Sequence, residues 1–597
     1  MKLIVTEKER MAQNIARALG NYSRRLFRPD GGTRREGRRA SGVYVYDIAG
    51  EYAILPLSGH IMGYVTSKEI DRWSHASVDS ILSDPKSLLK IVLRRSYSMA
   101  LRSLAREASE IIIATDSDEE GENIGLEVLE IIGEAGATMR SKRVSRLWLT
   151  TTMPEDIRSS FSRLRSFNFN LAKSVEARRK VDAIVGFSGT RELTLSLKKS
   201  VASGRGVLSF GRVQTSTLWL VVEREREILS FVPRPFWEIK ARVKDTTFLH
   251  ASCPFFDKAE AFRIYERVKD AKEFFCDSVE ERESEVNPPK PLNTSEMLKV
   301  GSSLLHLSPS KVMSLAEDLY LSSLITYPRV DNQTYSSSFN HEANLEKLSR
   351  TTSFGEYAKE LVSKKLISPS RGRFSEDHEP ITPINGMKED QKKTPLGYRL
   401  YELILRHYLS IFGPKALFLE RKVKGTINGE VFKADGRTLI DKGFYAIYYF
   451  PAKEKSIDSF SIDSKHPVKE LSILEGKTEP PPRYTQSGLL SKMEQVGIGT
   501  KSTRPGMIET LKSRNYIRIE RASGGGSFIR PTERGMKLIE IIERPWGRYI
   551  SPEFTARVEE EMEKIAQGRR DWEELVSSER KTFAEAISAI RKVRSAH

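Results

Sequence analysis

The segment EIIIATDSDEEGE, residues 110–122, decides the fold prediction for the first part of this chain. It begins with an apolar run that is typical of a buried strand and continues into an acidic turn, after which a helix is predicted from Asn123 to about Ile132. Nearer the N-terminus, KLIV at residues 2–5 is a second apolar strand that a helical pattern follows. This alternation up to about residue 150 predicts an α/β domain with a mostly parallel sheet.

Acidic side chains gather where the strand of residues 110–122 ends, and they are Asp116, Asp118, Glu120 and Glu122. Open α/β sheets bind ligands at the carboxyl ends of their strands, so this cluster can bind a hard cation such as Mg²⁺. Glu7 and Lys8 follow the first strand, and in a parallel sheet they would lie beside the cluster. The alternative is a solvated acidic turn whose charges favour the start of the next helix. The residues alone leave both interpretations open.

The remainder of the chain changes between helical and strand patterns at proline-rich boundaries. Strand-rich segments bracket a helical one, so we expect one domain to be inserted in another. Asn428-Gly429 predicts a β-hairpin turn, and the arginine-rich segment 24–39 predicts a loop. The predicted domains are an α/β domain at 1–150, a helical domain at 151–232 and 480–597, a β-rich domain at 233–290 and 415–479, and a helical domain at 291–414.

Composition narrows the class of partner and the compartment. The 597 residues contain 97 Lys and Arg against 80 Asp and Glu, a formal charge of +17 that favours a polyanionic partner such as nucleic acid. Two cysteines exclude a disulfide scaffold and fit a reducing compartment, so we expect a cytoplasmic protein. No apolar run approaches the roughly 18 residues that a membrane span needs. The phosphate-binding loop of the common ATPases is absent from the sequence, so we expect no nucleotide cofactor.

The segment LITYPRVDNQTY, residues 324–335, places Tyr327 where a short apolar strand meets a polar turn. A phenol has a pKa of about 10, so a nucleophilic tyrosine needs a neighbouring positive charge or base. Arg329 stands two residues later and could supply that charge. A tyrosine at the end of a strand is otherwise a packing residue, and Tyr335, which has no such neighbour, is interpreted that way.

Six motifs in order resemble the type IA DNA topoisomerases, and the last is most similar to archaeal members. The motifs are IVTEK, ATDSDEEGE, FGRVQTSTL, ITYPRVDNQ, EDHEPITP and PPPRYTQSGLLSKMEQVGIGTKST. The resemblance implies a multidomain protein, in which an N-terminal α/β Toprim domain is followed by a toroidal gate of nested helical and β domains. In this layout 151–232 with 480–597 would bind DNA, 233–290 with 415–479 would form the hinge, and 291–414 would carry the active-site tyrosine.

The resemblance also implies a reaction. Tyr327 would cut one DNA strand and become linked to the 5′ phosphate, another strand would pass, and the cut would be resealed. This would relax negatively supercoiled DNA without ATP. Arg329 is similar to the family's phosphate-binding arginine, Lys8 to its candidate general acid, and Glu7 to a residue that serves the same step. Bound Mg²⁺ is expected, and the ligands implied for it are Glu7, Asp116, Asp118 and Glu120.

Further positions match DNA contacts of the family, whereas on their own they would be read as solvated or ordinary polar side chains. The matching residues are Arg178, Arg179, Arg212, Gln214, His378, Ser502, Thr503 and Arg514. The expected partner is DNA with single-stranded segments, and we expect a monomer. The alternatives are a Toprim nuclease without covalent chemistry and a non-catalytic DNA-binding protein, which would have lost the tyrosine or the acidic cluster.

Overall fold

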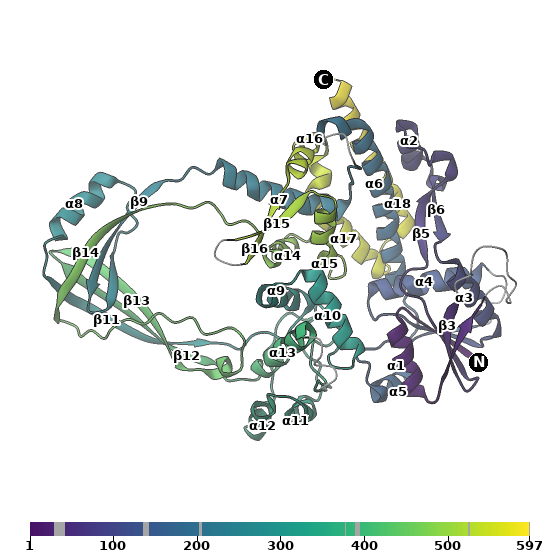
Figure 1. Ribbon diagram of the computed structural model, residues 1–597, viewed down its shortest axis with the longest axis horizontal. Coiled ribbons are helices and arrows are strands. Elements are labelled where there is room, and N and C mark those ends of the chain that lie inside the picture. The colour runs from purple at the N-terminus through teal and green to yellow at the C-terminus, as the bar shows by residue number, and fades with distance from the viewer. Residues whose placement is uncertain are drawn as a thin grey trace.

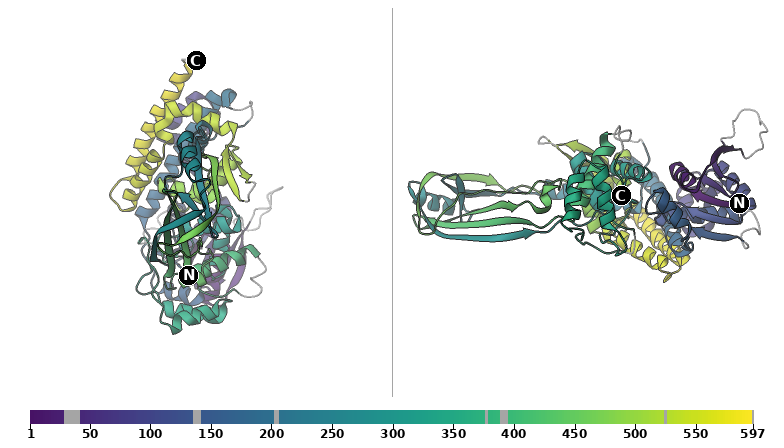
Figure 2. Two further views of the ribbon diagram at one scale, coloured as in Figure 1. Left: turned by 90° about the vertical axis from the view of Figure 1, so that its left-hand side faces the viewer. Right: turned by 90° about the horizontal axis from the view of Figure 1, so that it is seen from below.

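The computed structural model describes residues 1–28, 42–134, 142–201, 206–375, 378–387, 395–522 and 526–595. In Figure 1 its elements run around a ring, with a strand barrel at one end and the N-terminal sheet domain beyond the other. The views in Figure 2 show that the barrel extends away from the rest of the molecule. None of the helices in these described ranges is both long and apolar enough to cross a membrane.

The N-terminal sheet domain is built on six strands in the order β2-β3-β4-β1-β7-β8. β1 pairs in parallel with β4 and β7, and β7 pairs in parallel with β8, whereas β2 and β3 are antiparallel additions at one edge. The prediction of a mostly parallel sheet is confirmed. The strands are β1 (Lys2–Thr6), β2 (Ser23–Phe27), β3 (Val43–Ile48), β4 (Tyr52–Pro56), β7 (Glu110–Ala114) and β8 (Arg143–Arg146).

Strand β2 corrects the prediction of a loop at residues 24–39. Residues 23–27 pair with β3, because an edge strand with one solvated face can carry arginines that look like loop residues. The rest of the predicted loop, from residue 29, lies outside the described residues.

Helices cover both faces of this sheet, as the alternation of side chains along β1 requires. Leu3 and Val5 pack with α3 and α4 in one core cluster, whereas Ile4 packs with α1 and α5 in another. A two-stranded sheet and a further helix extend the domain. These elements are α1 (Glu9–Leu19), α3 (Arg95–Glu107), α4 (Glu119–Gly133), α5 (Pro154–Phe161), β5 (Met62–Thr66), β6 (Leu88–Val92) and α2 (His75–Ser83).

The barrel is a closed ring of six strands in the order β10-β13-β12-β11-β14-β9, all antiparallel to their neighbours. Asn428 and Gly429, with φ of 48° and 82°, make the β12–β13 turn, so the predicted hairpin is confirmed. The elements are β9 (Pro235–Val243), β10 (Thr246–His250), α8 (Lys258–Val268), β11 (Glu273–Val286), β12 (Ala416–Ile427), β13 (Glu430–Asp441) and β14 (Lys465–Lys477).

Five helices, here called the inserted helices, lie in the chain between β11 and β12. They stand between the barrel and the sheet domain in Figure 1. α10 and α13 pack on each other and on α9, and α11 packs on α12. The inserted helices are α9 (Thr294–Leu305), α10 (Pro309–Leu321), α11 (His341–Thr351), α12 (Gly355–Ser363) and α13 (Pro395–Ser410).

The remaining helices come from two distant parts of the chain and pack together, α6 against α17 and α18, and α7 against α16. A two-stranded sheet, β15 with β16, interrupts a region for which only helices are predicted. Ile517 and Ile529 are buried on one face of this hairpin. Sequence reasoning missed the hairpin because the segments on either side of it have a helical pattern. The elements are α6 (Phe169–Val201), α7 (Arg212–Ser230), α14 (Gln486–Gln495), α15 (Arg504–Ser513), β15 (Ile517–Arg521), β16 (Ser527–Pro531), α16 (Glu533–Ile550), α17 (Pro552–Ala566) and α18 (Trp572–Ser595).

Candidate active site

The adjacent ends of β1 and β7 bring two predicted groups together. Thr6 lies opposite Ala114 in the parallel register, so the residues that follow each strand share one edge of the sheet. Lys8 Nζ donates to Asp116 Oδ2 at 2.6 Å. Although burial lowers the pKa of Lys8, the carboxylates of Asp116 and Glu7 raise it above the ordinary value. Lys8 is therefore a charged ammonium held against the acidic cluster.

Asp118 has two partners, one on each oxygen. Its Oδ1 accepts from the amide of Gly121 at 2.8 Å and caps α4, which is why the helix begins at Glu119 rather than at Asn123 as predicted. Its Oδ2 accepts from the hydroxyl of Tyr327 at 2.8 Å. This one buried carboxylate thus both caps α4 and accepts a hydrogen bond from the predicted tyrosine.

Tyr327 lies across the border between the sheet domain and the inserted helices. Its ring is 1% exposed, and its amide donates to the carbonyl of Thr150 at 2.9 Å. Burial, together with the charges of Asp118 and Asp116, raises the phenol pKa well above its ordinary value. The structure therefore holds a protonated phenol against the acidic cluster and closed to solvent.

Arg329 approaches the same cluster, since its Nη1 lies 4.0 Å from Asp118 Oδ2. Its main partner is Glu317 on α10, whose Oε1 accepts from Arg329 Nε at 3.1 Å and also from Nη2. Glu317 Oε2 accepts from Lys8 Nζ at 3.5 Å. Sequence reasoning missed Glu317, because one partner lies 309 residues away and α10 has no motif that singles it out.

His378 packs against Tyr327, with 5.1 Å between their ring centroids. The other face of the imidazole stacks on Trp148 at 5.2 Å and 10°. Its Nε2 donates to the carbonyl of Ser117, in the acidic turn itself. His378 therefore lies beside the tyrosine, and Trp148 is a neighbour that the sequence did not indicate.

Tyr335 is partly buried and has a separate set of partners. Its hydroxyl shares a hydrogen bond of 2.8 Å with Thr382, and its ring packs on Phe339, His341 and Tyr408. These contacts fit the interpretation of Tyr335 as a packing residue.

Three carboxyl groups, those of Glu7, Asp116 and Asp118, lie near one another at the sheet edge. Burial and the charge of Asp116 raise the pKa of Glu7 to about 8, and burial raises the pKa of Asp116 despite Lys8. Within the described residues, Asp116 Oδ1 is a buried oxygen without a hydrogen-bond partner. A divalent cation beside it would satisfy this oxygen and offset the repulsion. In the arrangement of the described residues, no group of three or more His, Cys, Asp or Glu side chains could hold a metal ion, so binding of a cation here would require these carboxyl groups to rearrange.

Glu120, the fourth predicted ligand, has other partners. Its carboxylate accepts from Arg178 and, at 3.3 Å, interacts with Nε2 of His60. Burial alone would raise its pKa, but the hydrogen bond with His60 and the charge of Arg178 lower it to about 2. Glu120 on α4 is therefore engaged in an ion pair with Arg178 on α6, and this pair links the two helices.

The predicted DNA-contacting arginines of α6 and α7 are mostly enclosed by acids. Arg178 is 5% exposed and pairs with Glu119 at 3.0 Å as well as with Glu120. Arg179 pairs with Glu127 and donates to the carbonyl of Met62 at 3.0 Å. Buried Arg212 pairs with Glu559 at 2.8 Å and Asp182 at 3.3 Å.

The other predicted contacts differ in their surroundings. Gln214 Nε2 donates to the carbonyl and to the hydroxyl of Ser209, which precedes α7 in the chain. Thr503 precedes α15 and its hydroxyl accepts from the amide of Thr500 at 2.8 Å, whereas Ser502 Oγ is buried without a hydrogen-bond partner among the described residues. Arg514, at the end of α15, is exposed.

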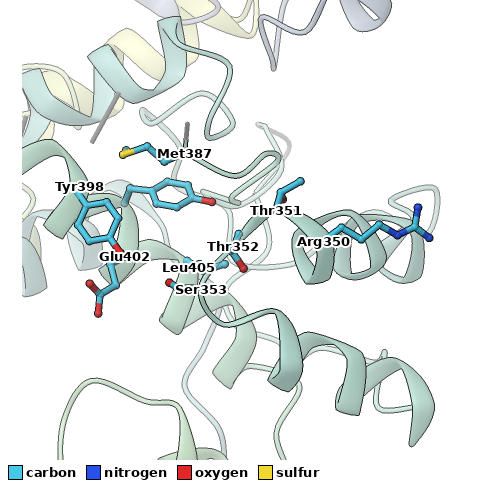
Figure 3. Close-up of a pocket in the computed structure, with 9 residues that line it drawn as sticks. Arg350, Thr351, Thr352, Ser353, Met387, Tyr398, Glu402 and Leu405 are labelled. Carbon is cyan, nitrogen blue, oxygen red and sulfur yellow. The ribbon is translucent and has the colours of Figure 1, made fainter. Parts of the chain in front are cut away.

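A separate pocket of about 300 Å³ lies among the inserted helices, between the α11–α12 connection and α13. Figure 3 shows Arg350 directed away from the other lining side chains. The hydroxyls of Thr351 and Thr352 donate to carbonyls of their own helix. None of the predicted site residues lines this pocket.

Comparisons with known proteins agree along the whole chain. The family model described as Toprim domain matches residues 2–149, and the one described as DNA topoisomerase matches residues 166–577. The solved structure of full-length topoisomerase I from Thermotoga maritima has the same fold, with a TM-score of 0.75 and 24% identity, over 98% of this chain and 90% of that one.

Relatives of known name are similar over nearly the whole of this chain, which spans a smaller share of their own length. DNA topoisomerase 1 of Archaeoglobus fulgidus is 33% identical over 98% of this chain and 84% of its own. The enzyme of the same name from Thermoplasma acidophilum is also 33% identical, over 98% and 73%. Human DNA topoisomerase 3-beta-1 is 28% identical, over 96% and 67%.

Proposed function

The chain belongs to the type IA DNA topoisomerases, and from this premise we propose that Tyr327 is the nucleophile that cuts one DNA strand. Its oxygen attacks a backbone phosphorus, the new phosphotyrosine bond forms at the 5′ phosphate, and the 3′ oxygen leaves. After strand passage the 3′ hydroxyl attacks the phosphotyrosine and restores the strand, so the bond energy is kept and no ATP is needed. The placement of the Tyr327 hydroxyl on Asp118, next to Arg329, is the observation that carries this proposal.

The side chains around Tyr327 suit this chemistry. The hydrogen bond to Asp118 fixes the phenol oxygen, while Arg329 offers a planar fork for two phosphate oxygens and stabilises the charge that develops there. Lys8 carries a proton that it can give to the leaving 3′ oxygen, and Glu7 beside it serves the same step. His378 would support a phosphate near the cut.

We further propose that Glu7, Asp116 and Asp118 hold Mg²⁺, with Glu120 remaining a candidate ligand only if it leaves Arg178 and His60. When bound, the ion would supply positive charge near the phosphate during resealing. The orphaned oxygen of Asp116 and the raised pKa of Glu7 support this assignment.

The proposed substrate is negatively supercoiled DNA with single-stranded segments, which suits a chain of formal charge +17. Following the motifs, we propose DNA contacts from the exposed Arg514 and from Ser502, Thr503 and Gln214, and from Arg178, Arg179 and Arg212 where DNA replaces their acidic partners. The proposed layout remains a Toprim domain, a discontinuous DNA-binding domain, a β-rich hinge and a gate at 291–414. We propose a cytoplasmic monomer, and two free cysteines suit a reducing compartment.

Tyr327 is 1% exposed, so the inserted helices must move from the sheet domain before DNA reaches it. Substitution tests the role directly. We expect Tyr327→Phe to form no covalent adduct with a labelled single-stranded oligonucleotide and to lose relaxation by at least about 10³-fold. Tyr335→Phe, which also removes one hydrogen-bonded tyrosine hydroxyl, is the matched control and should retain the adduct. An adduct in Tyr327→Phe at the wild-type level would refute the assignment.

A further inference from the structure

We propose that Glu317 is a positioning residue whose carboxylate takes the place of the DNA phosphate in the free enzyme. This inference rests on the proposed function and deepens it, because it assigns a role to a residue that neither the motifs nor the metal site includes. The role is to align Lys8 and Arg329 on one point before DNA arrives.

The geometry places Glu317 between the two cations that would meet the phosphate. Oε1 accepts from Arg329 and Oε2 accepts from Lys8 at 3.5 Å. Lys8 follows β1 of the sheet domain, whereas Glu317 and Arg329 belong to the part of the chain inserted in the barrel. One carboxylate therefore bridges the border on which the proposed reaction takes place.

A carboxylate and a phosphate are alike in the features that these cations recognise. Both present anionic oxygens that accept charge-assisted hydrogen bonds from a guanidinium group and from an ammonium group. The two oxygens of Glu317 are divided between Arg329 and Lys8, as two oxygens of a phosphate would be. The acid thus holds both cations in the arrangement that they need in the reaction.

The surroundings make this pairing more than a surface contact. The side chains of Lys8, Arg329 and Glu317 are only 26%, 22% and 21% exposed. Two cations so enclosed repel each other unless an anion lies between them. Without Glu317, Lys8 would keep its bond to Asp116, but Arg329 would keep only the 4.0 Å approach to Asp118, so we expect Arg329 to lose its alignment with Lys8 in the free enzyme. With Glu317 the two cations stay aligned, but the carboxylate opposes the incoming phosphate.

Two opposite effects on the reaction follow. Glu317 competes with the phosphate for Arg329, so its removal should strengthen binding of DNA. Glu317 also pre-organises Lys8 and Arg329, so its removal should slow the chemical step. A residue that merely supports the fold would weaken binding and chemistry together.

The test compares Glu317→Gln with Asp318→Asn in the full-length chain. Asp318 is the next residue on α10 and is exposed, so this control removes the same charge on the solvent side. For Glu317→Gln we expect the Kd for a single-stranded oligonucleotide to fall about three- to tenfold at low salt. We expect its single-turnover rate of adduct formation to fall about tenfold, and the control to change neither quantity. Glu317→Asp, which keeps the charge, should recover part of the rate.

Three results would overturn the inference. The first is a Glu317→Gln variant with the Kd and the cleavage rate of the wild type. The second is parallel weakening of binding and cleavage with a lower melting temperature, which would indicate a supporting role. The third is a changed Mg²⁺ requirement for resealing, which would make Glu317 a metal ligand. Because Kd is measured without cleavage, a wild-type chain that forms no adduct refutes the proposed function separately, while the Kd comparison still decides the inference.

Discussion

The inserted helices meet the rest of the protein at two borders that differ in chemistry. The border toward the sheet domain, here called the polar border, has hydrogen bonds between residues far apart in the chain, beside the stacking of Trp148 on His378. Asn14 donates to the carbonyl of Leu321 at 2.9 Å, Arg10 donates to Ser322 at 2.8 Å, and Tyr327 donates to Asp118. Hydrogen bonds of this kind can be exchanged for bonds to water or to DNA at modest cost.

Toward the barrel the chain itself crosses twice, after β11 and before β12, and the contacts are largely aromatic and buried. His407 on α13 donates from Nε2 to the carbonyl of Lys290 and accepts at Nδ1 from Tyr449, both at 2.7 Å. Its ring packs on Tyr448 and Tyr449, and Tyr448 in turn packs on Phe444, which shares a small core with Phe418 and Ala416 outside the inserted helices. Separating this border would expose apolar surface, which is costly. From this contrast we propose that the ring opens at the sheet domain and hinges at the barrel.

The largest expected effect comes from the polar border. Asp116→Asn together with Asp118→Asn would remove two charges from the proposed Mg²⁺ site, while asparagine can still cap α4. We expect Mg²⁺-supported resealing and relaxation to fall by about 10³-fold or more. Glu107→Gln, an exposed acid of the same domain, is the control. If the double variant kept the Mg²⁺ dependence of the wild type, Asp116 and Asp118 would not be Mg²⁺ ligands. The polar border would then not differ from the barrel border by holding the metal site.

The barrel border should be the acid-sensitive one. Burial lowers the pKa of His407 from 6.5 to about 4, so the folded state favours the neutral imidazole. The stability due to this preference is present above pH 6.5 and is lost as the pH falls toward 4, on the order of 3 kcal/mol. Denaturant unfolding at pH 7 and pH 4 measures the loss.

His407→Gln cannot take up the proton and should lose about that much less stability between the two pH values. His341→Gln provides a control. Burial also lowers the pKa of His341 to about 4, but its partner Tyr408 lies within the inserted helices, so this variant tests their own acid sensitivity and not that of the barrel border. An equal acid loss in wild type and His407→Gln would show that this histidine does not determine the border's stability.

The smallest expected effect is on amide hydrogen exchange, which can show whether one border opens without the other. The amide of Tyr327 bonds to Thr150 across the polar border, and the amide of Phe444 bonds to Pro414 on the barrel side. Asn14→Ala removes one hydrogen bond of about 1 kcal/mol, so hydrogen exchange at the Tyr327 amide should quicken about fivefold. Exchange at Phe444 should stay unchanged. Equal acceleration at both amides would mean that the two borders open together.

Local pattern was enough to predict the parallel sheet, the hairpin at Asn428 and the acidic cluster at a strand end, because side-chain period and turn residues are local properties. It misplaced the start of α4, since Asp118 looked like part of a turn until its contact with the Gly121 amide was seen. It also took residues 23–27 for loop, because an edge strand needs no continuous apolar run.

The site shows the same division. The motifs selected Tyr327, Arg329 and Lys8, but they could not show that the tyrosine is closed to solvent or that Glu317 joins the two cations. They also could not show that Arg178 and Arg212 are enclosed by acids, because the partners come from other helices. Pairing across hundreds of residues leaves no trace in a single sequence.

The sequence by itself therefore determined the family, the class of fold and the residue types at the reacting centre, because each depends on short patterns that stay intact in the unfolded chain. Only the tertiary structure decided which of these residues touch and which are held apart from solvent. The register of β1 against β7 sets Lys8 against Asp116, and the docking of α10 brings Glu317 to Lys8. Such distances are properties of packing between elements, and packing is fixed when the chain folds.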